Sequence, residues 1–74
     1  MPETFPQRLK RLRTEAGLSR AELAVKAGLG FNTVSCYERG TVDPSLFSLS
    51  CIADVFGVSM DYMAGRTEKM EVNK

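Results

Sequence analysis

The stretch that decides the fold is GLSRAELAVKAGLGFNTVSCYERG, residues 17–40. Ser19 is followed three residues later by Glu22, the spacing of a capping box that satisfies free N–H groups at a helix start. Gly28 to Gly30 then interrupts the helical pattern, and a second helix is predicted over about residues 31–39. Two short helices joined by a glycine-containing turn form a helix-turn-helix, whose second helix can enter the major groove of DNA.

The second helix of this stretch is predicted to have two chemically different faces. Val34 and Tyr37 are three residues apart and are expected to point inward, which leaves Asn32, Thr33 and Cys36 on the outer face. Most residues of this helix have only moderate helix propensity, so stability alone does not account for their choice. Short polar side chains at the exposed start of a helix suit close approach to base edges.

A further helix is predicted before the motif, from Phe5 to a stop at Gly17. Its apolar positions share one face and are Phe5, Leu9, Leu12 and Ala16. Its basic residues are Arg8, Lys10, Arg11 and Arg13. Two interpretations of these basic residues stay open, a solvated helix face or contact with phosphate groups.

Two more helices are predicted after the motif. Ser45 is placed to cap the first, which ends at Gly57 and has the apolar stripe Leu46, Leu49, Ile52, Ala53 and Phe56. Ser59 is placed to cap a short helix from Met60 to about Ala64, which ends at Gly65. Nearby Val58, Tyr62 and Met63 are expected to lie in the core or against a second copy of the chain. The predicted fold class is therefore all-α, one compact five-helix domain over residues 5–65, with a flexible arm at residues 1–4 and a polar tail at residues 66–74.

The composition excludes several classes of protein. The 74 residues suffice for one small domain, and a hydrophobic fraction of 43% is typical of a globular chain. The sequence has no 18-residue apolar run and no signal peptide, so we expect no membrane contact and a cytoplasmic, nucleoid-associated protein. It contains no histidine, and Cys36 and Cys51 form no CxxC pair. We therefore expect two free thiols, no metal, no cofactor, no small-molecule ligand and no enzymatic activity.

The charge is distributed unevenly along the chain. The formal net charge is only +1. Residues 1–40 contain seven basic and four acidic residues, whereas residues 41–74 contain three basic and five acidic ones. Attraction to phosphate needs a basic face and not a basic total, so this asymmetry permits DNA binding without requiring it.

Three segments together resemble a known family. They are RLKRLRTEAGLSRAELAVKAG at residues 8–28, NTVSCYERG at residues 32–40 and PSLFSLSCIADVFGVSMDYMAGRTE at residues 44–68. Over roughly residues 5–67 the chain resembles the Cro and phage-repressor class of helix-turn-helix proteins, the Xre family. The resemblance implies a repressor-type domain that binds double-stranded DNA sequence-specifically in the major groove, as a homodimer on a near-palindromic operator, and regulates transcription. The alternative is an antitoxin or protein-interaction module that uses the same fold.

The resemblance also implies roles for individual residues. The positions that face bases or flanking phosphates are Phe31, Asn32, Thr33 and Cys36. The positions that face phosphates are Arg20, Arg39, Gly40 and Thr41. Arg13 and Glu38 match an ion pair that ties the first helix to the end of the recognition helix, a structural role suited to a forked guanidinium–carboxylate contact.

The chain departs from the family pattern at three of these positions. Arg20 replaces the usual glutamine, and Cys36 replaces a position often held by a long polar side chain. Phe31 stands where polar residues are common, and it either contacts a thymine methyl group or covers the turn as satellite core. We therefore expect Asn32 to contribute most to base recognition, and Thr33 to contribute second. The amide of Asn32 can pair with adenine, which is worth about 1–3 kcal/mol of discrimination against other bases.

Overall fold

A computed structural model describes residues 3–70 of the chain. Its five helices are α1 (Phe5–Glu15), α2 (Arg20–Ala27), α3 (Phe31–Arg39), α4 (Leu46–Phe56) and α5 (Met60–Met63). No strand occurs among the described residues. The predicted all-α, five-helix fold class is confirmed, and the residues that start and stop the helices are largely those expected from the sequence.

Four of the five helices are capped at their start by a hydroxyl side chain. Ser19 caps α2 through the predicted capping box, accepting a 3.0 Å hydrogen bond from the N–H of Glu22, whose Oε1 accepts one of 2.8 Å from the N–H of Ser19. Ser45 and Ser59 cap α4 and α5, as predicted, by accepting a hydrogen bond from the N–H of Ser48 and of Tyr62 respectively. The cap of α1 was not foreseen, because Thr4 supplies it from within the segment that was expected to be a flexible arm.

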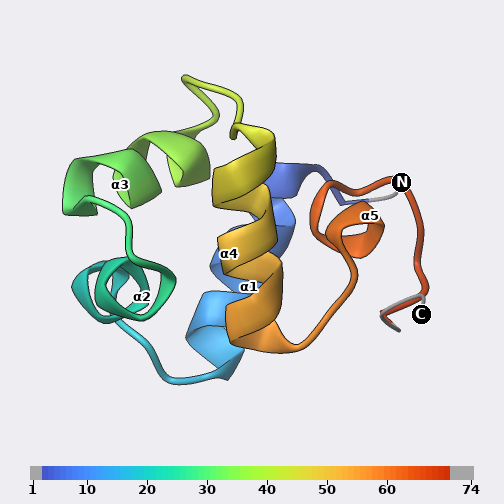
Figure 1. Ribbon diagram of the computed structural model, residues 1–74, viewed down its shortest axis with the longest axis horizontal. Helices are drawn as coiled ribbons and strands as arrows, with labels where there is room; N and C mark the ends of the chain where they lie inside the picture. Colours follow the sequence, from blue (N-terminus) through green and yellow to red (C-terminus); the bar gives the residue numbers. More distant parts are fainter. Residues whose placement is uncertain (1–2, 71–74) are drawn as a thin grey trace.

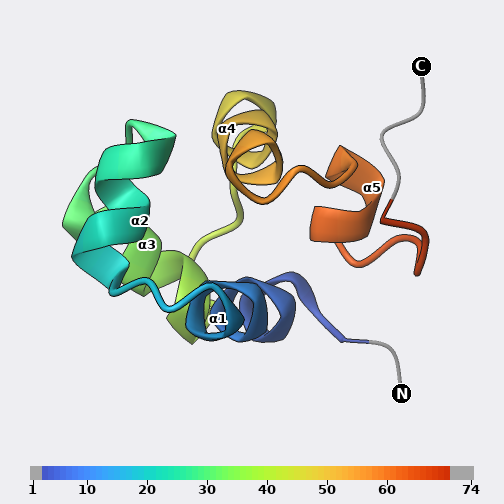
Figure 2. The same ribbon diagram turned by 90° about the horizontal axis from the view of Figure 1, so that it is seen from below.

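Helices α1 and α4 lie between the helix-turn-helix pair and α5 (Figures 1 and 2). Helix α3 packs against both α1 and α2, while α4 contacts α2 and α5, and α5 also contacts α1. Figure 2 shows α2 and α3 together on the side of the molecule opposite α5. The motif is therefore held by α1 and α4, and its far side has no other helix against it.

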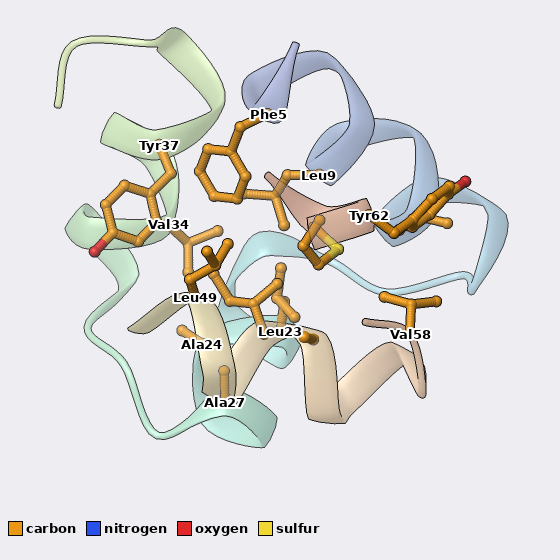
Figure 3. Packing of buried hydrophobic residues seen from close by; sticks show 14 residues of the cluster. Phe5, Leu9, Leu23, Ala24, Ala27, Val34, Tyr37, Leu49, Val58 and Tyr62 are labelled. Carbon is orange, nitrogen blue, oxygen red and sulfur yellow. The ribbon is translucent and has the colours of Figure 1, made fainter. Parts of the chain in front are cut away.

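Every helix contributes a completely buried side chain to one core. These residues are Leu9, Leu23, Val34, Ile52 and Met63. The ring of Phe5 packs edge-on against Tyr37, with ring centres 5.7 Å apart, which joins the start of α1 to the end of α3 (Figure 3). Replacing a buried leucine of this kind by alanine typically costs about 2–5 kcal/mol, so the core sets the positions of all five helices.

The apolar pattern differs from expectation at Leu46, and the structure decides between the two alternatives given for Tyr62 and Met63. Leu46, predicted to belong to the buried stripe of α4, is 78% exposed, because no other part of the described chain covers its side chain. The rest of that stripe is buried or packed against the core. Tyr62 and Met63 of α5 are buried within the molecule, so the core interpretation of these residues is right and they offer no surface to a second copy.

The basic residues of α1 are not one solvated or phosphate-binding face. Arg8 is 1% exposed, and its guanidinium carbon lies 4.1 Å from the ring centre of Tyr62. It donates hydrogen bonds to the backbone carbonyls of Tyr62 (2.9 Å) and Thr67 (3.0 Å) and to the carboxylates of Glu3 and Glu68. Both interpretations left open by the sequence are wrong for Arg8, which joins the two ends of the described chain.

Residues on either side of the five helices take part in this arrangement. Glu3 pairs with both Arg8 and Arg11, and the N–H of Ser59 donates to the carbonyl of Met70 over 2.9 Å. Residues 1–2 of the predicted arm and residues 71–74 of the predicted tail lie outside the described residues. Within the part that the structure describes, no buried side-chain nitrogen or oxygen lacks a hydrogen-bond partner.

Candidate nucleic-acid interface

The turn between α2 and α3 is short and anchored at its centre. Gly28 ends α2 in the left-handed conformation, with φ of 70°, which a residue with a β-carbon adopts only at a cost. The N–H of Leu29 donates to the carbonyl of Ala24 over 2.8 Å, and the Leu29 side chain packs against the core. Gly30 then starts α3 without a side-chain cap. The two helices are thus joined by three residues in a helix-turn-helix geometry.

Helix α3 has one buried and one open face. Val34, Ser35 and Tyr37 are buried, whereas Asn32 and Arg39 are exposed. Thr33 and Cys36 are half-buried. Because Asn32, Cys36 and Arg39 follow the spacing i, i+4 and i+7, they share the open face, and Thr33 lies beside Cys36. The structure therefore brings the predicted outer-face residues of α3 together on one side.

Phe31 begins this helix and is 53% exposed. It does not belong to the hydrophobic core and is not among the partly buried residues packed against it. The ring lies in the first turn of α3, next to Asn32. The sequence left two interpretations of Phe31 open, contact with a thymine methyl group or coverage of the turn as part of a satellite core. The exposure of the ring does not support the second.

The exit of α3 is fixed by contacts to Cys36. A terminal nitrogen of Arg39 lies 3.5 Å from the sulfur of Cys36. The backbone N–H and the hydroxyl of Thr41 donate to the Cys36 carbonyl over 3.1 and 3.2 Å. Gly40, between them, has a φ of 74° and turns the chain away from the helix. The predicted phosphate-facing residues Arg39, Gly40 and Thr41 are therefore held in one place beside the open face of α3.

The predicted ion pair between Arg13 and Glu38 is present. Nε of Arg13 lies 2.5 Å from Oε2 of Glu38, and a terminal nitrogen of Arg13 lies 3.1 Å from Oε1, which is the forked geometry expected. The remaining terminal nitrogen donates to the carbonyl of Leu18 over 2.8 Å. The hydrogen bonds that Arg13 donates to Glu38 raise the pKa of Arg13, although burial opposes the shift. These contacts join α1, the loop after it and the last turn of α3.

Arg20 contacts the same carboxylate, which the sequence did not indicate. Its Nε lies 3.2 Å from Oε1 of Glu38, and its side chain is 42% exposed. The two residues are eighteen positions apart and belong to different helices, so no periodicity in the sequence links them. The resemblance assigned Glu38 to Arg13 alone, whereas the structure places both arginines on it.

The described residues contain no group of three His, Cys, Asp or Glu side chains arranged to hold a metal ion. Cys36 and Cys51 are both free thiols. Among the helices of residues 3–70, none is long and apolar enough to cross a membrane.

Comparison with known proteins identifies the motif. A helix-turn-helix family model matches residues 9–63, most of the chain and all of α2 and α3. The chain belongs to the Xre and phage-repressor family of helix-turn-helix proteins.

Two family members illustrate the similarity in sequence. The chain is 37% identical over 68 residues to the HTH-type transcriptional regulator ImmR of Bacillus subtilis, covering 92% of this chain and 54% of ImmR. It is 33% identical over 64 residues to the cryptic phage CTXphi transcriptional repressor RstR of Vibrio cholerae, covering 86% of this chain and 58% of RstR. The chain thus spans a little over half the length of these relatives.

A third relative extends the similarity to solved structures. SinR of Bacillus subtilis, a master regulator for biofilm formation, is known in complex with DNA, and that structure is 36% identical with a TM-score of 0.76. The match covers 81% of this chain and 97% of the SinR chain. SinR is also known in a complex with the SinI protein, with a TM-score of 0.77, 36% identity and coverage of 81% of this chain and 59% of SinR.

Within this family member, sequence reasoning placed the outer-face residues of α3 but missed two clusters of charged groups. One is the pairing of Arg20 with Glu38 and the other is the buried Arg8 with its partners. Each depends on side chains far apart in the chain, which spacing rules within one helix do not reach. A weak signal existed for Arg8, because it lies one residue before Leu9 and three residues after Phe5, which are both buried positions of α1.

Proposed function

We propose that this chain is a sequence-specific double-stranded DNA-binding transcriptional regulator, a repressor, that places α3 in the major groove. The observation that carries the proposal is the open face of α3. Its inner side is fixed by Val34, Tyr37 and Glu38. Its outer side presents the exposed Asn32 and Arg39 and the half-buried Cys36. A helix exposed in this way fits the width of the B-DNA major groove.

Base recognition is assigned to the first half of α3. The exposed amide of Asn32 can donate to N7 and accept from N6 of adenine in a bidentate contact. The exposed ring of Phe31 suits apolar contact with a thymine methyl group. Thr33 and Cys36 add a hydroxyl and a weakly polar surface beside them, so shape and apolar contact contribute at the Cys36 position.

Backbone contacts are assigned to residues that flank this face. Arg20 at the start of α2 and Arg39 at the end of α3 supply positive charge, and Gly40 and Thr41 follow Arg39 at the helix exit. Contacts of this kind fix the register of a protein on the duplex and give binding its salt dependence, without specifying sequence. Binding to chromosomal DNA would place the protein on the nucleoid.

The proposal includes a homodimer on a near-palindromic operator. A dimer with two-fold symmetry places two recognition helices about 34 Å apart, one turn of the double helix, and so selects half-sites related by the same symmetry. The similarity to regulators and repressors of the same family supports this arrangement.

The test is selection of bound sequences from a random pool of DNA duplexes, repeated at several salt concentrations. We expect enrichment of a two-fold symmetric motif, and an affinity that falls steeply as salt increases. Absence of any enriched sequence at low salt would overturn the proposal. The complex of SinR with SinI makes a protein-interaction module the second candidate. Capture of a protein partner by a chain that enriches no DNA sequence would favour that candidate.

A further inference from the structure

Glu38 is nearly enclosed by positive groups. Its side chain is 2% exposed, and its two oxygens accept hydrogen bonds from three nitrogens that belong to two arginines. Arg13 from α1 supplies two of these nitrogens, and Arg20 from α2 supplies the third. One buried carboxylate on α3 is therefore shared between an arginine of α1 and an arginine of α2.

The two arginines use this carboxylate differently. Arg13 is buried and has committed all three of its nitrogens, two to Glu38 and one to the carbonyl of Leu18. Arg20 has committed only Nε, and no acceptor among the described residues bonds to its two terminal nitrogens. Two guanidinium charges face one carboxylate, so one positive charge is left over. It lies on the partly exposed residue, whose outer end carries four N–H groups.

We infer that Glu38 is a positioning residue which holds Arg20 in the orientation that contacts a phosphate of the DNA backbone. The inference rests on the proposed function. The guanidinium is planar and rigid, so a hydrogen bond at Nε fixes the direction of the terminal N–H groups. Fixing that direction before binding removes part of the entropy cost that a free arginine would incur on meeting the phosphate. A phosphate oxygen, with its negative charge and several lone pairs, is the ligand that matches a paired guanidinium fork.

A backbone phosphate fits better than a base for geometric reasons. Arg20 is the first residue of α2 and not part of α3, so it flanks the helix that faces the groove. The carboxylate of Glu38 that holds Arg20 also binds Arg13 of α1. The contact between Arg20 and a phosphate therefore depends on the packing of α1 against α3. Glu38 thus links the placement of the recognition helix to the placement of one phosphate-binding group.

The experiment is a double-mutant cycle in DNA affinity on a duplex obtained by selection. In the wild type, Arg20→Ala should weaken binding by about tenfold, a value typical for one hydrogen bond to a charged group. The same substitution should lower the slope of log affinity against log salt by about 0.9, equally for matched and mismatched duplexes. In a Glu38→Gln background, Arg20→Ala should weaken binding by less than about threefold, because the orientation is already lost.

Arg13→Gln is the matched control. It removes the same forked pair with α1 as Glu38→Gln does, yet it leaves the contact between Glu38 and Arg20 in place. In the Arg13→Gln background, Arg20→Ala should still weaken DNA binding by about tenfold. Equal losses from Arg20→Ala in the wild type and in the Glu38→Gln background would overturn the positioning role while leaving DNA binding intact. Absence of any loss in the wild type would overturn the phosphate contact itself. Failure of the wild type to bind any duplex would instead overturn the proposed function.

A second measurement, hydrogen exchange of the Arg20 Nε–H, does not need the Glu38→Gln and Arg13→Gln variants, which remove a buried ion pair. In a ¹H–¹⁵N spectrum, the Nε–H of Arg20 is assigned by its disappearance in Arg20→Ala. Its exchange with water should be slower than that of the Nε–H of Arg39, which has no acceptor within the described part of the chain. Equal exchange rates for the two groups would show that Glu38 does not hold Arg20 in solution, and would overturn the inference.

Discussion

Arg13 and Glu38 join the last turn of α1 to the last turn of α3 through two hydrogen bonds of 2.5 and 3.1 Å. Both side chains are buried, so the pair is shielded from solvent screening. The orientation of the recognition helix relative to the rest of the fold therefore depends on a charge pair as well as on the core.

Replacement of Arg13 by alanine is expected to destabilise the fold. Removing one partner of a buried pair leaves the other charge uncompensated, and Arg20 offsets only part of it, so we expect a loss of about 3 kcal/mol in the free energy of unfolding. For a domain of this size the loss lowers Tm by at least about 10 °C. Thermal unfolding followed by circular dichroism measures it, with Lys10→Ala as the control because Lys10 is exposed on the same helix. An unchanged Tm would mean that the pair is not buried in solution.

Replacement of Arg8 is expected to destabilise the protein without affecting DNA recognition. Arg8→Ala leaves the carbonyls of Tyr62 and Thr67 without their donor, and we expect a loss of about 3–5 kcal/mol. Glu68→Ala removes only an exposed partner and should cost less than about 1 kcal/mol. Urea unfolding separates the two variants. Similar losses in both would contradict the assignment of Arg8 as the buried centre of this cluster.

The carboxylate of Glu3 is expected to make stability depend on pH in the acid range. A hydrogen bond from Arg11, and a further one from Arg8, lower its pKa from the ordinary 4.5 to about 2. A pKa lowered in the folded state gives stability that is fully present above pH 4.5 and is lost as pH falls toward 2.

The free energy of unfolding of the wild type and of Glu3→Gln, measured across this range, isolates the contribution of Glu3. The difference between the two proteins should be constant above pH 4.5 and shrink steadily on acidification to pH 2. A difference that does not change with pH would show that the carboxylate charge of Glu3 contributes nothing to stability.

Modification of Cys36 is expected to block DNA binding. Its half-buried thiol lies on the open face of α3 between Asn32 and Arg39, so an added group would occupy space needed between helix and groove. In a Cys51→Ser protein, complete alkylation with N-ethylmaleimide should weaken binding by at least about tenfold. The Cys36→Ser, Cys51→Ser protein treated identically serves as the control. Full affinity after quantitative modification would place Cys36 outside the interface.

Local rules predicted the helices well because each boundary is determined by residues close together in sequence. Ser19 with Glu22 starts α2, and Gly28 and Gly40 end α2 and α3, as spacing and backbone preference dictate. The outer face of α3 also followed from spacing alone. The DNA roles of its residues stay predictions, since geometry shows only where the side chains lie.

Three features could not be predicted because they depend on contacts between distant segments. Leu46 fits the apolar period of α4, but burial requires a neighbouring segment, and none of the described residues covers the Leu46 side chain. A charged residue such as Arg8 is expected at the surface, and its burial depends on Tyr62 and Thr67, which only the fold places beside it. Arg20 was assigned a role from the family pattern, yet its contact with Glu38 arises from a substitution at a position where that pattern has glutamine.

Substitution of single bases tests most directly whether α3 recognises bases through Asn32. Wild type and Asn32→Ala are titrated, at one salt concentration, with a selected duplex and with every single-base variant of it. We expect Asn32→Ala to lose about 1–3 kcal/mol of discrimination at one base pair in each half-site and to keep the base preferences at all other positions. Equal weakening on every duplex, with every base preference retained, would contradict it.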